Sequence, residues 1–171
     1  MRVKLCSVVP MVNASGPAMD RAETVTLFND LCILAPATLI DAPITWQALD
    51  DHHVRGVFTN GAQTVTADLT FHGGDLVDFV SDDRATTSRD GSLIPQRWST
   101  PVRTYAHLVT RRLATYGEGR WASEAQGEFA YLKYHLDTIT YNAETPQIDL
   151  PAPDCSTRPQ VIGASKLGWR P

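Results

Sequence analysis

The residues of this chain that could do chemistry form two short clusters and include one isolated glutamate. The first cluster, Asp50-Asp51-His52-His53, combines carboxylates with imidazoles, which are the ingredients of a metal site or an acid/base pair. Because adjacent strand residues point to opposite faces, His52 and His53 share one ion only if they lie in a turn. A polar turn between two apolar strands explains the cluster more simply, so we expect no metal site there.

The second cluster is Asp82-Asp83-Arg84, whose opposite charges allow an ion pair at the rim of a sheet. Exposed pairs contribute little free energy, so a structural or incidental role is expected. The sequence has no phosphate-binding glycine loop, no dinucleotide fingerprint and no H-E-x-x-H motif, so we expect no cofactor. If the protein is an enzyme, its acid/base candidates are Asp51, His53, Arg84 and Glu118.

Aromatic side chains recur along the segments that alternate apolar and polar residues. Such residues on a curved antiparallel sheet can line a cavity for a hydrophobic ligand. They are also ordinary core material, and a filled core is the simpler interpretation of any single ring. The candidate ligand-binding residues are Trp46, Phe58, Phe71, Phe79, Trp98, Tyr105, Trp121, Phe129 and Tyr131.

Composition argues against two classes of partner. The chain has 171 residues, with 15 Lys and Arg against 19 Asp and Glu, and its formal net charge is -4. Binding to nucleic acid relies on clustered basic residues, which this chain scatters, so no nucleic-acid partner is expected. The longest apolar run, Leu31 to Ile40, is too short to span a bilayer and is interrupted by Pro36. We therefore expect no transmembrane segment.

The N-terminus and the cysteines bear on the compartment. Arg2 and Lys4 precede an apolar stretch from Leu5 to Val12, which has the general form of a signal peptide. Ser7 and Pro10 interrupt that stretch, so we expect a buried strand and a cytoplasmic protein, with secretion as the alternative. The cysteines are odd in number and widely spaced, so reduced thiols are expected at Cys6, Cys32 and Cys155.

Hydrophobic periodicity predicts one helix and many strands that position these residues. The helix is expected over Asp20–Leu34, with a capping box at Asp20 and Glu23 and an end before Pro36. Asn60-Gly61 predicts a hairpin with a type I′ turn. Residues 82–95 are expected to form a mobile loop, and a change of polarity within 128–141 predicts a bulge or two different environments along that strand. The expected strands are 2–9, 44–49, 54–59, 63–71, 76–81, 97–109, 112–116, 119–122 and 128–141.

The composition changes near the C-terminus. Five of the 11 prolines lie in the last 26 residues, and proline is excluded from helix interiors and central strands. We therefore expect a single β-rich domain over residues 1–145 and a proline-rich tail, extended or disordered, over 146–171.

Several short segments, taken in order, resemble the DUF6544 family of uncharacterised bacterial proteins. The matching segments include Asn13-Ala14-Ser15-Gly16-Pro17, Ala35-Pro36-Ala37-Thr38-Leu39, Phe79-Val80-Ser81-Asp82-Asp83-Arg84, Trp98-Ser99-Thr100-Pro101, Gly117-Glu118-Gly119-Arg120-Trp121 and Gly127-Glu128-Phe129-Ala130-Tyr131. The resemblance implies an antiparallel β domain similar to the open half-barrels of lipoprotein carriers, with no established activity. Longer members carry an additional N-terminal portion, whose loss would free backbone groups for dimerisation.

Together these patterns predict a mainly β (α+β) fold. We expect a curved antiparallel sheet or open half-barrel, similar to lipocalins or lipoprotein carriers, with one main helix near the N-terminus. The expected function is binding of a hydrophobic small molecule in the cavity of the sheet. One alternative is a small isomerase or cyclase that acts on an apolar substrate in the same cavity. Another is a homo-oligomeric interaction module, such as a homodimer.

Overall fold

The computed structural model describes residues 2–5, 9–13, 16–88, 91–123 and 127–142. Strands predominate in this part of the chain and one long helix lies near the N-terminus, so the predicted fold class is confirmed. Two compact units are distinguished: Ala14–Tyr141, and a second unit that includes Arg2–Asn13. The predicted domain boundary at 145, the tail, Cys6 and Cys155 lie outside the described residues.

The second unit contains an antiparallel pair of strands. β1 (Arg2–Leu5) lies beside β2 (Val9–Asn13), and the register shifts between Val3 and Lys4. The sequence predicted one strand over 2–9, which is wrong, because Arg2–Leu5 and Val9–Asn13 are separate strands that pair antiparallel. β-Branched valines favour extended backbone up to Asn13, and the proline of β2 lies opposite Lys4 at the shift, where a ladder donor can be missing.

The helix of the main unit begins earlier than predicted. α1 (Pro17–Leu34) is preceded by Gly16 at φ 115° and followed by a short 3₁₀ helix, η1 (Pro36–Ile40). The predicted capping box is wrong, because the Asp20 amide already donates to Gly16 O at 3.0 Å within the first turn. Proline suits the first helical position, where its missing N–H has no partner to lose. The end before Pro36 is confirmed.

The main unit is built on an eight-stranded antiparallel sheet that is not closed. Its pairing order is β10-β11-β9-β6-β5-β4-β3, and β12 also pairs with β11. The strands are β3 (Ile44–Ala48), β4 (His53–Asn60), β5 (Gln63–His72), β6 (Asp75–Ser81), β9 (Trp98–Ser99), β10 (Val102–Leu108), β11 (Arg111–Ser123) and β12 (Gly127–His135).

The hairpin between β4 and β5 is confirmed, but its turn is not of the predicted type. Asn60 pairs with Gln63, which leaves Gly61 and Ala62 at the centre, and only Gly61 has positive φ, at 58°. This is the pattern of a type II′ turn, which places glycine first. In the next hairpin both Gly73 and Gly74 have positive φ, the pattern of a type I′ turn.

The later strands differ in extent from those predicted. The strand expected over 97–109 is interrupted at Pro101, since proline lacks a ladder donor, and it forms β9 and β10. The two strands expected over 112–116 and 119–122 are one strand, β11. The bulge is confirmed, because the β11–β12 register shifts between Gly119 and Arg120. The expected loop holds a small hairpin of β7 (Ala85–Thr87) and β8 (Leu93–Pro95).

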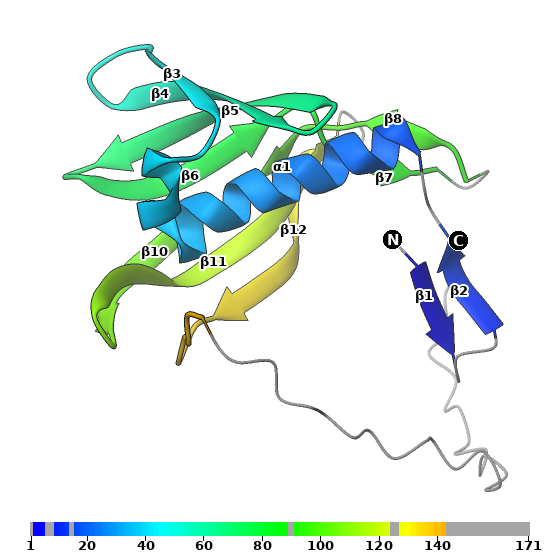
Figure 1. The fold of residues 1–171 in the computed structure, drawn as a ribbon. Coiled ribbons are helices and arrows are strands. Elements are labelled where there is room, and N and C mark those ends of the chain that lie inside the picture. Colours follow the sequence, from blue (N-terminus) through cyan, green and yellow to red (C-terminus); the bar gives the residue numbers. More distant parts are fainter. Residues whose placement is uncertain (1, 6–8, 14–15, 89–90, 124–126, 143–171) are drawn as a thin grey trace, which may run out of the picture. The chain divides into compact units, whose positions relative to one another are not determined.

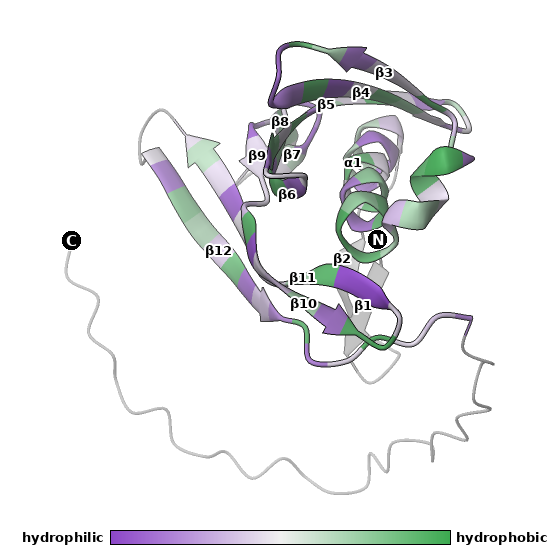
Figure 2. Cartoon of the chain, turned by 90° about the vertical axis from the view of Figure 1, so that its left-hand side faces the viewer, coloured by the Kyte–Doolittle hydropathy of each residue, from purple (hydrophilic) through white to green (hydrophobic). Residues whose placement is uncertain are grey.

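The sheet curls around α1, which lies along its concave face (Figure 1 and Figure 2). Seen along the helix in Figure 2, β3 to β5 pass on one side of α1 and β10 and β11 on the other. The core lies between helix and sheet, and its largest fully buried side chains are Phe28, Phe79, Leu69, Leu113, Val25 and Val65. No helix in the described part of the chain is long and apolar enough to cross a membrane.

Candidate functional site

Three of the nine candidate aromatic residues fill the core instead of lining a cavity. Phe58, Phe79 and Trp98 are buried, and Phe28 of α1 lies among them. The Phe28 ring centroid is 5.2 Å from that of Phe58 and 5.3 Å from that of Phe79, in an edge-on contact with Phe79. Trp98 lies 6.2 Å beyond Phe79. The concave face is therefore occupied by the helix along this stretch.

Four other candidates lie on the outer parts of the sheet. Trp46 of β3 is partly exposed and its ring covers Gly56, where an added Cβ would lie 2.8 Å from the indole. Phe129 and Tyr131 of the edge strand β12 are exposed. Trp121 of β11 is half-buried and its ring lies 5.8 Å from that of Tyr131.

The two remaining candidates, Phe71 and Tyr105, line a cavity of about 220 Å³ where α1 ends. We refer to it as the apolar cavity. α1, η1, β5, β6, β10 and β11 all contribute to its walls. Its apolar lining consists mainly of Cys32, Ile33, Leu39, Leu69, Phe71, Leu76 and Leu113. The cavity is therefore a feature of tertiary packing, since its residues come from positions 32 to 113 of the chain.

The polar groups of the apolar cavity are all engaged or held neutral. The Tyr105 hydroxyl donates to Leu76 O at 2.9 Å, and burial raises the pKa of Tyr105. Burial also raises the pKa of the Cys32 thiol to about 12, so it stays protonated at neutral pH. Asp75 and Arg112 form an ion pair in the wall of the cavity, and that bond lowers the pKa of Asp75. No group here is prepared for acid/base or nucleophilic chemistry.

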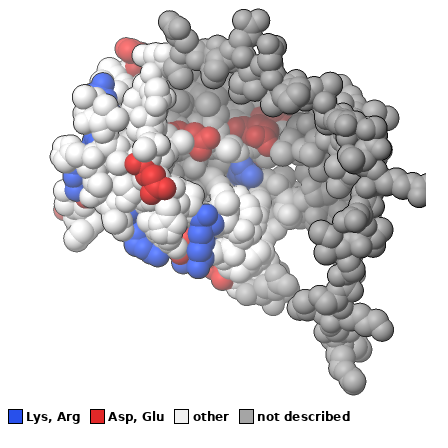
Figure 3. Space-filling model, turned by 90° about the horizontal axis from the view of Figure 1, so that it is seen from below, with Lys and Arg blue, Asp and Glu red and all other residues white. Residues whose placement is uncertain are grey.

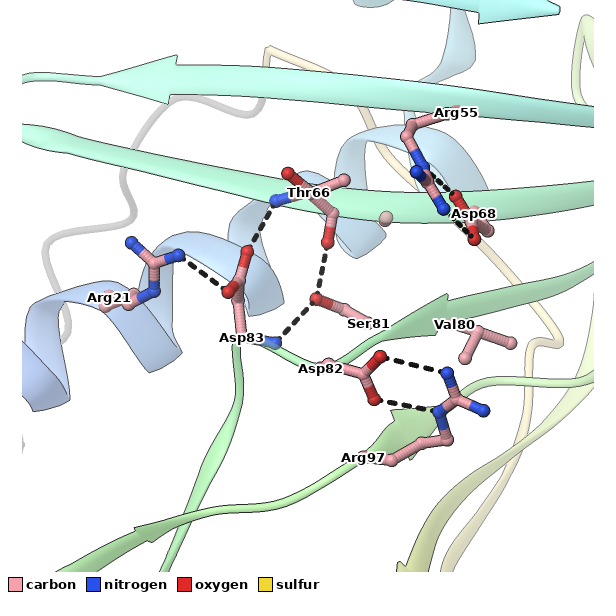
Figure 4. A pocket seen from close by; sticks show the side chains of 10 residues that line it. Arg21, Arg55, Thr66, Asp68, Val80, Ser81, Asp82, Asp83 and Arg97 are labelled. Atoms are coloured by element: carbon pink, nitrogen blue, oxygen red, sulfur yellow. Dashed lines mark hydrogen bonds and ion pairs between the residues drawn. The ribbon is translucent and has the colours of Figure 1, made fainter. Parts of the chain in front are cut away.

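The Ser81–Asp83 segment forms a densely bonded corner next to the N-terminal half of α1 (Figure 4). Ser81 Oγ donates to Thr66 O at 2.6 Å, and Thr66 N donates to Asp83 Oδ2 at 2.7 Å. Arg21 of α1 lies 2.6 Å from the same carboxylate. Asp82 accepts two bonds from Arg97, at 2.8 and 2.9 Å. The two aspartates thus connect β5, α1 and Arg97. These contacts support the structural role expected from the sequence.

Arg84 follows this corner and lies between α1 and the indole rings of the sheet. Its Cζ is 4.7 Å from the ring centroid of Trp98 and 5.5 Å from that of Trp121. Nη1 donates to the Thr26 hydroxyl, whereas Nε is buried and has no hydrogen-bond partner. Burial lowers the pKa of Arg84. In Figure 3, which views the molecule from below, acidic and basic side chains lie close together on the described surface.

Glu118 is held in a network of its own on β11. Its side chain is 6% exposed and accepts bonds from the Tyr116 hydroxyl and from Arg120 Nε and Nη2, at 2.9 and 2.7 Å. Arg103 lies 3.4 Å away. The Tyr116 hydrogen bond and then Arg120 lower the pKa of Glu118 to about 2. The Glu118 carboxylate therefore stays ionised, and its oxygens are already occupied by hydrogen-bond donors.

The Asp50–His53 cluster is the polar turn between β3 and β4. Asp50 Oδ1 accepts from the amides of His52 and His53 at 2.8 and 2.9 Å, and the His53 ring lies 2.8 Å away. The His52 amide bond is the main cause of a lowered Asp50 pKa. Asp51 is exposed in the turn. The described residues hold no group of three or more His, Cys, Asp or Glu placed to bind a metal.

The four acid/base candidates are therefore not brought together. Asp51 and His53 lie at the β3–β4 turn, Glu118 lies on β11 across the sheet, and Arg84 lies beneath α1. Sequence analysis missed Tyr134 of β12, whose hydroxyl is buried without a hydrogen-bond partner and whose pKa burial raises to about 12. It also missed the role of Cys32 in the apolar cavity, for which the helical spacing of apolar residues was the only signal.

A scan against family models matches residues 1–134 to a family of unknown function, DUF6544. The chain belongs to the DUF6544 family. No curated protein and no solved structure matched this DUF6544 chain in the corresponding searches. The family therefore supplies no activity, and the function of this DUF6544 domain has to be inferred from its own geometry.

Two segments that carried the family resemblance have structural explanations. In the Phe79–Arg84 segment, Phe79 enters the core, the next polar residues form the corner beside α1, and Arg84 reaches beneath the helix. In the Gly117–Trp121 segment, both glycines lie under tyrosine rings of β12, because added Cβ atoms would lie 2.4 Å from Tyr134 and 3.0 Å from Tyr131. These DUF6544 segments hold the concave face together.

Proposed function

We propose that this protein binds a small apolar molecule in the apolar cavity at the C-terminal end of α1. The observation that carries the proposal is the volume of about 220 Å³ within an apolar lining. Apolar cavities of about 150 Å³ bind benzene, so this cavity has room for a single ring with a short alkyl chain. Phe71 and Tyr105, two of the aromatic candidates, lie in its wall.

Binding has more support here than catalysis. Of the titratable groups in the wall, Cys32 and Tyr105 have raised pKa values and remain protonated at neutral pH, while Asp75 is held in an ion pair with Arg112. The acid/base candidates Asp51, His53, Arg84 and Glu118 are not part of its lining. An isomerase or cyclase would need a positioned proton donor or acceptor beside its substrate.

The experiment is a calorimetric titration with propylbenzene, compared between wild-type protein and two tryptophan variants. Leu39→Trp places a large ring in the apolar cavity and should weaken binding about tenfold or more. Leu49→Trp is the matched control, because Leu49 is exposed after β3 and is not part of the lining. It should bind as the wild type does.

A second measurement guards against a variant that fails to fold. In the methyl-labelled wild-type protein, propylbenzene should shift the resonances of Leu39, Leu76 and Leu113 and leave that of Leu49 in place. Absence of saturable shifts, or equal shifts at Leu49, would contradict the proposal. Native mass spectrometry of the same sample reports retained ligand and oligomeric state together, which also checks the predicted homodimer.

A further inference from the structure

Arg84 and the exposed Arg111 are the described arginines of the main unit without a carboxylate in contact, and of these two only Arg84 is partly buried. The arginines within 4.0 Å of a carboxylate are Arg21, Arg55, Arg97, Arg103, Arg112 and Arg120. No such partner exists for Arg84 among the described residues. A buried charge normally has a partner, because its lost hydration must be replaced. No carboxylate of the described residues occupies the guanidinium, so it can bind an anionic ligand.

The position of Arg84 is fixed by the segments on both sides of it. The corner formed by Ser81, Asp82 and Asp83 is bonded to β5, α1 and Arg97. The Gln96 amide donates to Arg84 O at 2.9 Å, and this hydrogen bond fixes the backbone position of Arg84 itself. A backbone held this rigidly loses little freedom when the side chain turns to meet a ligand.

The guanidinium has donors in reserve. Only Nη1 is used by the helix, through the Thr26 hydroxyl, and it lies 3.5 Å from Ala22 O. Nε is buried without a partner. The indole faces of Trp98 and Trp121 lie against the guanidinium and stabilise its positive charge by cation–π contacts. These contacts do not use its N–H groups.

The neighbouring charged groups are either paired or out of contact with Arg84, so its guanidinium is the group that an anion would bind. Asp82 and Asp83 are neutralised by the arginines that they bind. Glu23 and Asp30 of α1 act on Arg84 through space only, without contact, as does Tyr131 of β12. Burial raises the pKa of Asp30, which favours its neutral form beside the site.

A recess of about 170 Å³ opens beside Arg84 and limits the size of the ligand. Apolar side chains from α1 and β8, namely Ala18, Leu93 and Pro95, form much of its wall. Arg84 lines the same recess, together with Arg21, Ala85 and the ion-paired Asp82 and Asp83. The volume is comparable to cavities that hold benzene, so one ring or a short acyl chain fits.

We propose that Arg84 anchors the carboxylate of a small aromatic or short-chain acid in this recess. The carboxylate accepts charge-assisted hydrogen bonds from the guanidinium, which turns toward the recess so that Nε gains its missing partner. The apolar part of the acid packs on Ala18, Leu93 and Pro95. This site is separate from the apolar cavity, and it does not depend on the function proposed there.

The test compares benzoate with benzamide, which has the same shape without the charge, by calorimetry and by tryptophan fluorescence. Wild-type protein should bind benzoate about tenfold or more tightly than benzamide. Arg84→Lys keeps the charge but loses the Nε donor, and it should weaken benzoate binding about tenfold or more. The control is Arg111→Lys, at an exposed position of β11, which should bind benzoate unchanged.

The Nε–H resonance of Arg84 in the wild-type protein provides a measurement that needs no variant to fold. Benzoate should shift this resonance, and benzamide should not. Equal affinity for the two compounds, an unchanged affinity in Arg84→Lys, or no saturable benzoate binding at millimolar concentration would each overturn the proposal. Propylbenzene titrations of the Arg84→Lys protein should match the wild type, so a failure at this recess is distinguishable from a failure at the apolar cavity.

Discussion

The two halves of the sheet contact α1 in different ways. Against β3 to β6 the helix packs ring on ring, with Phe28 between Phe58 and Phe79. The half from β9 to β12 also contributes apolar residues to the core, among them Leu113 and Ala114, but buried polar atoms without a partner occur as well. Among the described residues these atoms are Tyr134 OH on β12, Thr100 Oγ1 between β9 and β10, Arg84 Nε between β6 and β7, and Asn29 Oδ1 on α1 itself. No residue of β3 to β6 carries such an atom in the described part of the chain.

This difference distinguishes a region that stabilises the fold from a region that can bind a ligand. Tight apolar packing contributes stability in proportion to the area that it removes from water. An unpartnered buried polar atom costs stability, and natural proteins tolerate few of them. Arg84 Nε is one of these atoms, and this is the physical reason for placing Arg84 at a binding site.

The largest expected effect comes from removing the Phe28 ring at the centre of the core. Phe28→Ala should lower the free energy of unfolding by about 3–5 kcal/mol, because it leaves a cavity between two rings. Urea unfolding measures the loss. Leu27→Ala, one residue away and 41% exposed, should cost about 0.5 kcal/mol or less. Trp121→Ala should cost less than Phe28→Ala because its ring is half-buried, and equal costs would show that the halves are packed alike.

A pair of glycines tests the tolerance of each half to added volume. Gly56→Ala should cost about 1–3 kcal/mol, because its Cβ would lie 2.7 Å from Phe28 and 2.8 Å from Trp46. Gly117→Ala brings a Cβ to 2.4 Å from Tyr134, but Tyr134 lies on an edge strand that pairs on one side and can move. We expect a smaller loss in urea unfolding at Gly117. The reverse order would mean that β12 is held as firmly as β4.

Two carboxyls, one from each half, should give opposite pH dependence. Burial raises the pKa of Asp78 on β6 from 3.8 to about 6, so folding favours its protonated form. Its contribution to stability is full below pH 3.8 and is lost as the pH rises through about 6. Glu118 has its pKa lowered from 4.5 to about 2, so its contribution is present above pH 4.5 and is lost as the pH falls through about 2.

Urea unfolding as a function of pH measures both contributions. Relative to wild type, Asp78→Asn should gain about 1–2 kcal/mol between pH 4 and pH 7, allowing for the partial exposure of the carboxyl. Glu118→Gln should lose stability at pH 7 and converge on the wild type in strong acid. A flat difference for Asp78→Asn would show that this carboxyl is not held neutral by the fold.

The smallest expected effects come from two buried tyrosine hydroxyls. The Tyr105 hydroxyl donates to Leu76 O, so Tyr105→Phe should cost about 1 kcal/mol. The Tyr134 hydroxyl has no partner, so Tyr134→Phe should be neutral or slightly stabilising. Thermal unfolding of the two variants under the same conditions compares them. A substantial loss in Tyr134→Phe would mean that its hydroxyl is satisfied.

Much of the fold was predictable because its signals are local. Pro36 ends α1, and the glycine turn after Asn60 forms the hairpin of β4 and β5. The errors arose where one local signal overrode another. Pro17 began the helix before Asp20 could cap it, and Pro101 divided a strand that alternation alone made continuous.

The candidate site was less predictable than the fold. Alternation identified Phe58, Phe71 and Phe79 as inward residues, but it could not distinguish a ring in the filled core from a ring beside a cavity. Phe58 and Phe79 pack on Phe28, whereas Phe71 lines the apolar cavity. That distinction depends on where α1 lies in the curled sheet, which no periodicity within one segment reports.

The sequence by itself determined an antiparallel β fold with one helix, a polar β3–β4 turn and a buried free Cys32, because turn chemistry and hydrophobic periodicity act over a few residues. The tertiary structure alone decided which charges are paired. Asp83 contacts Arg21, 62 residues away, while Arg84 contacts Thr26, at a separation of 58, and no carboxylate among the described residues. Long-range packing places these partners, so it also decides where a guanidinium is left to bind something else.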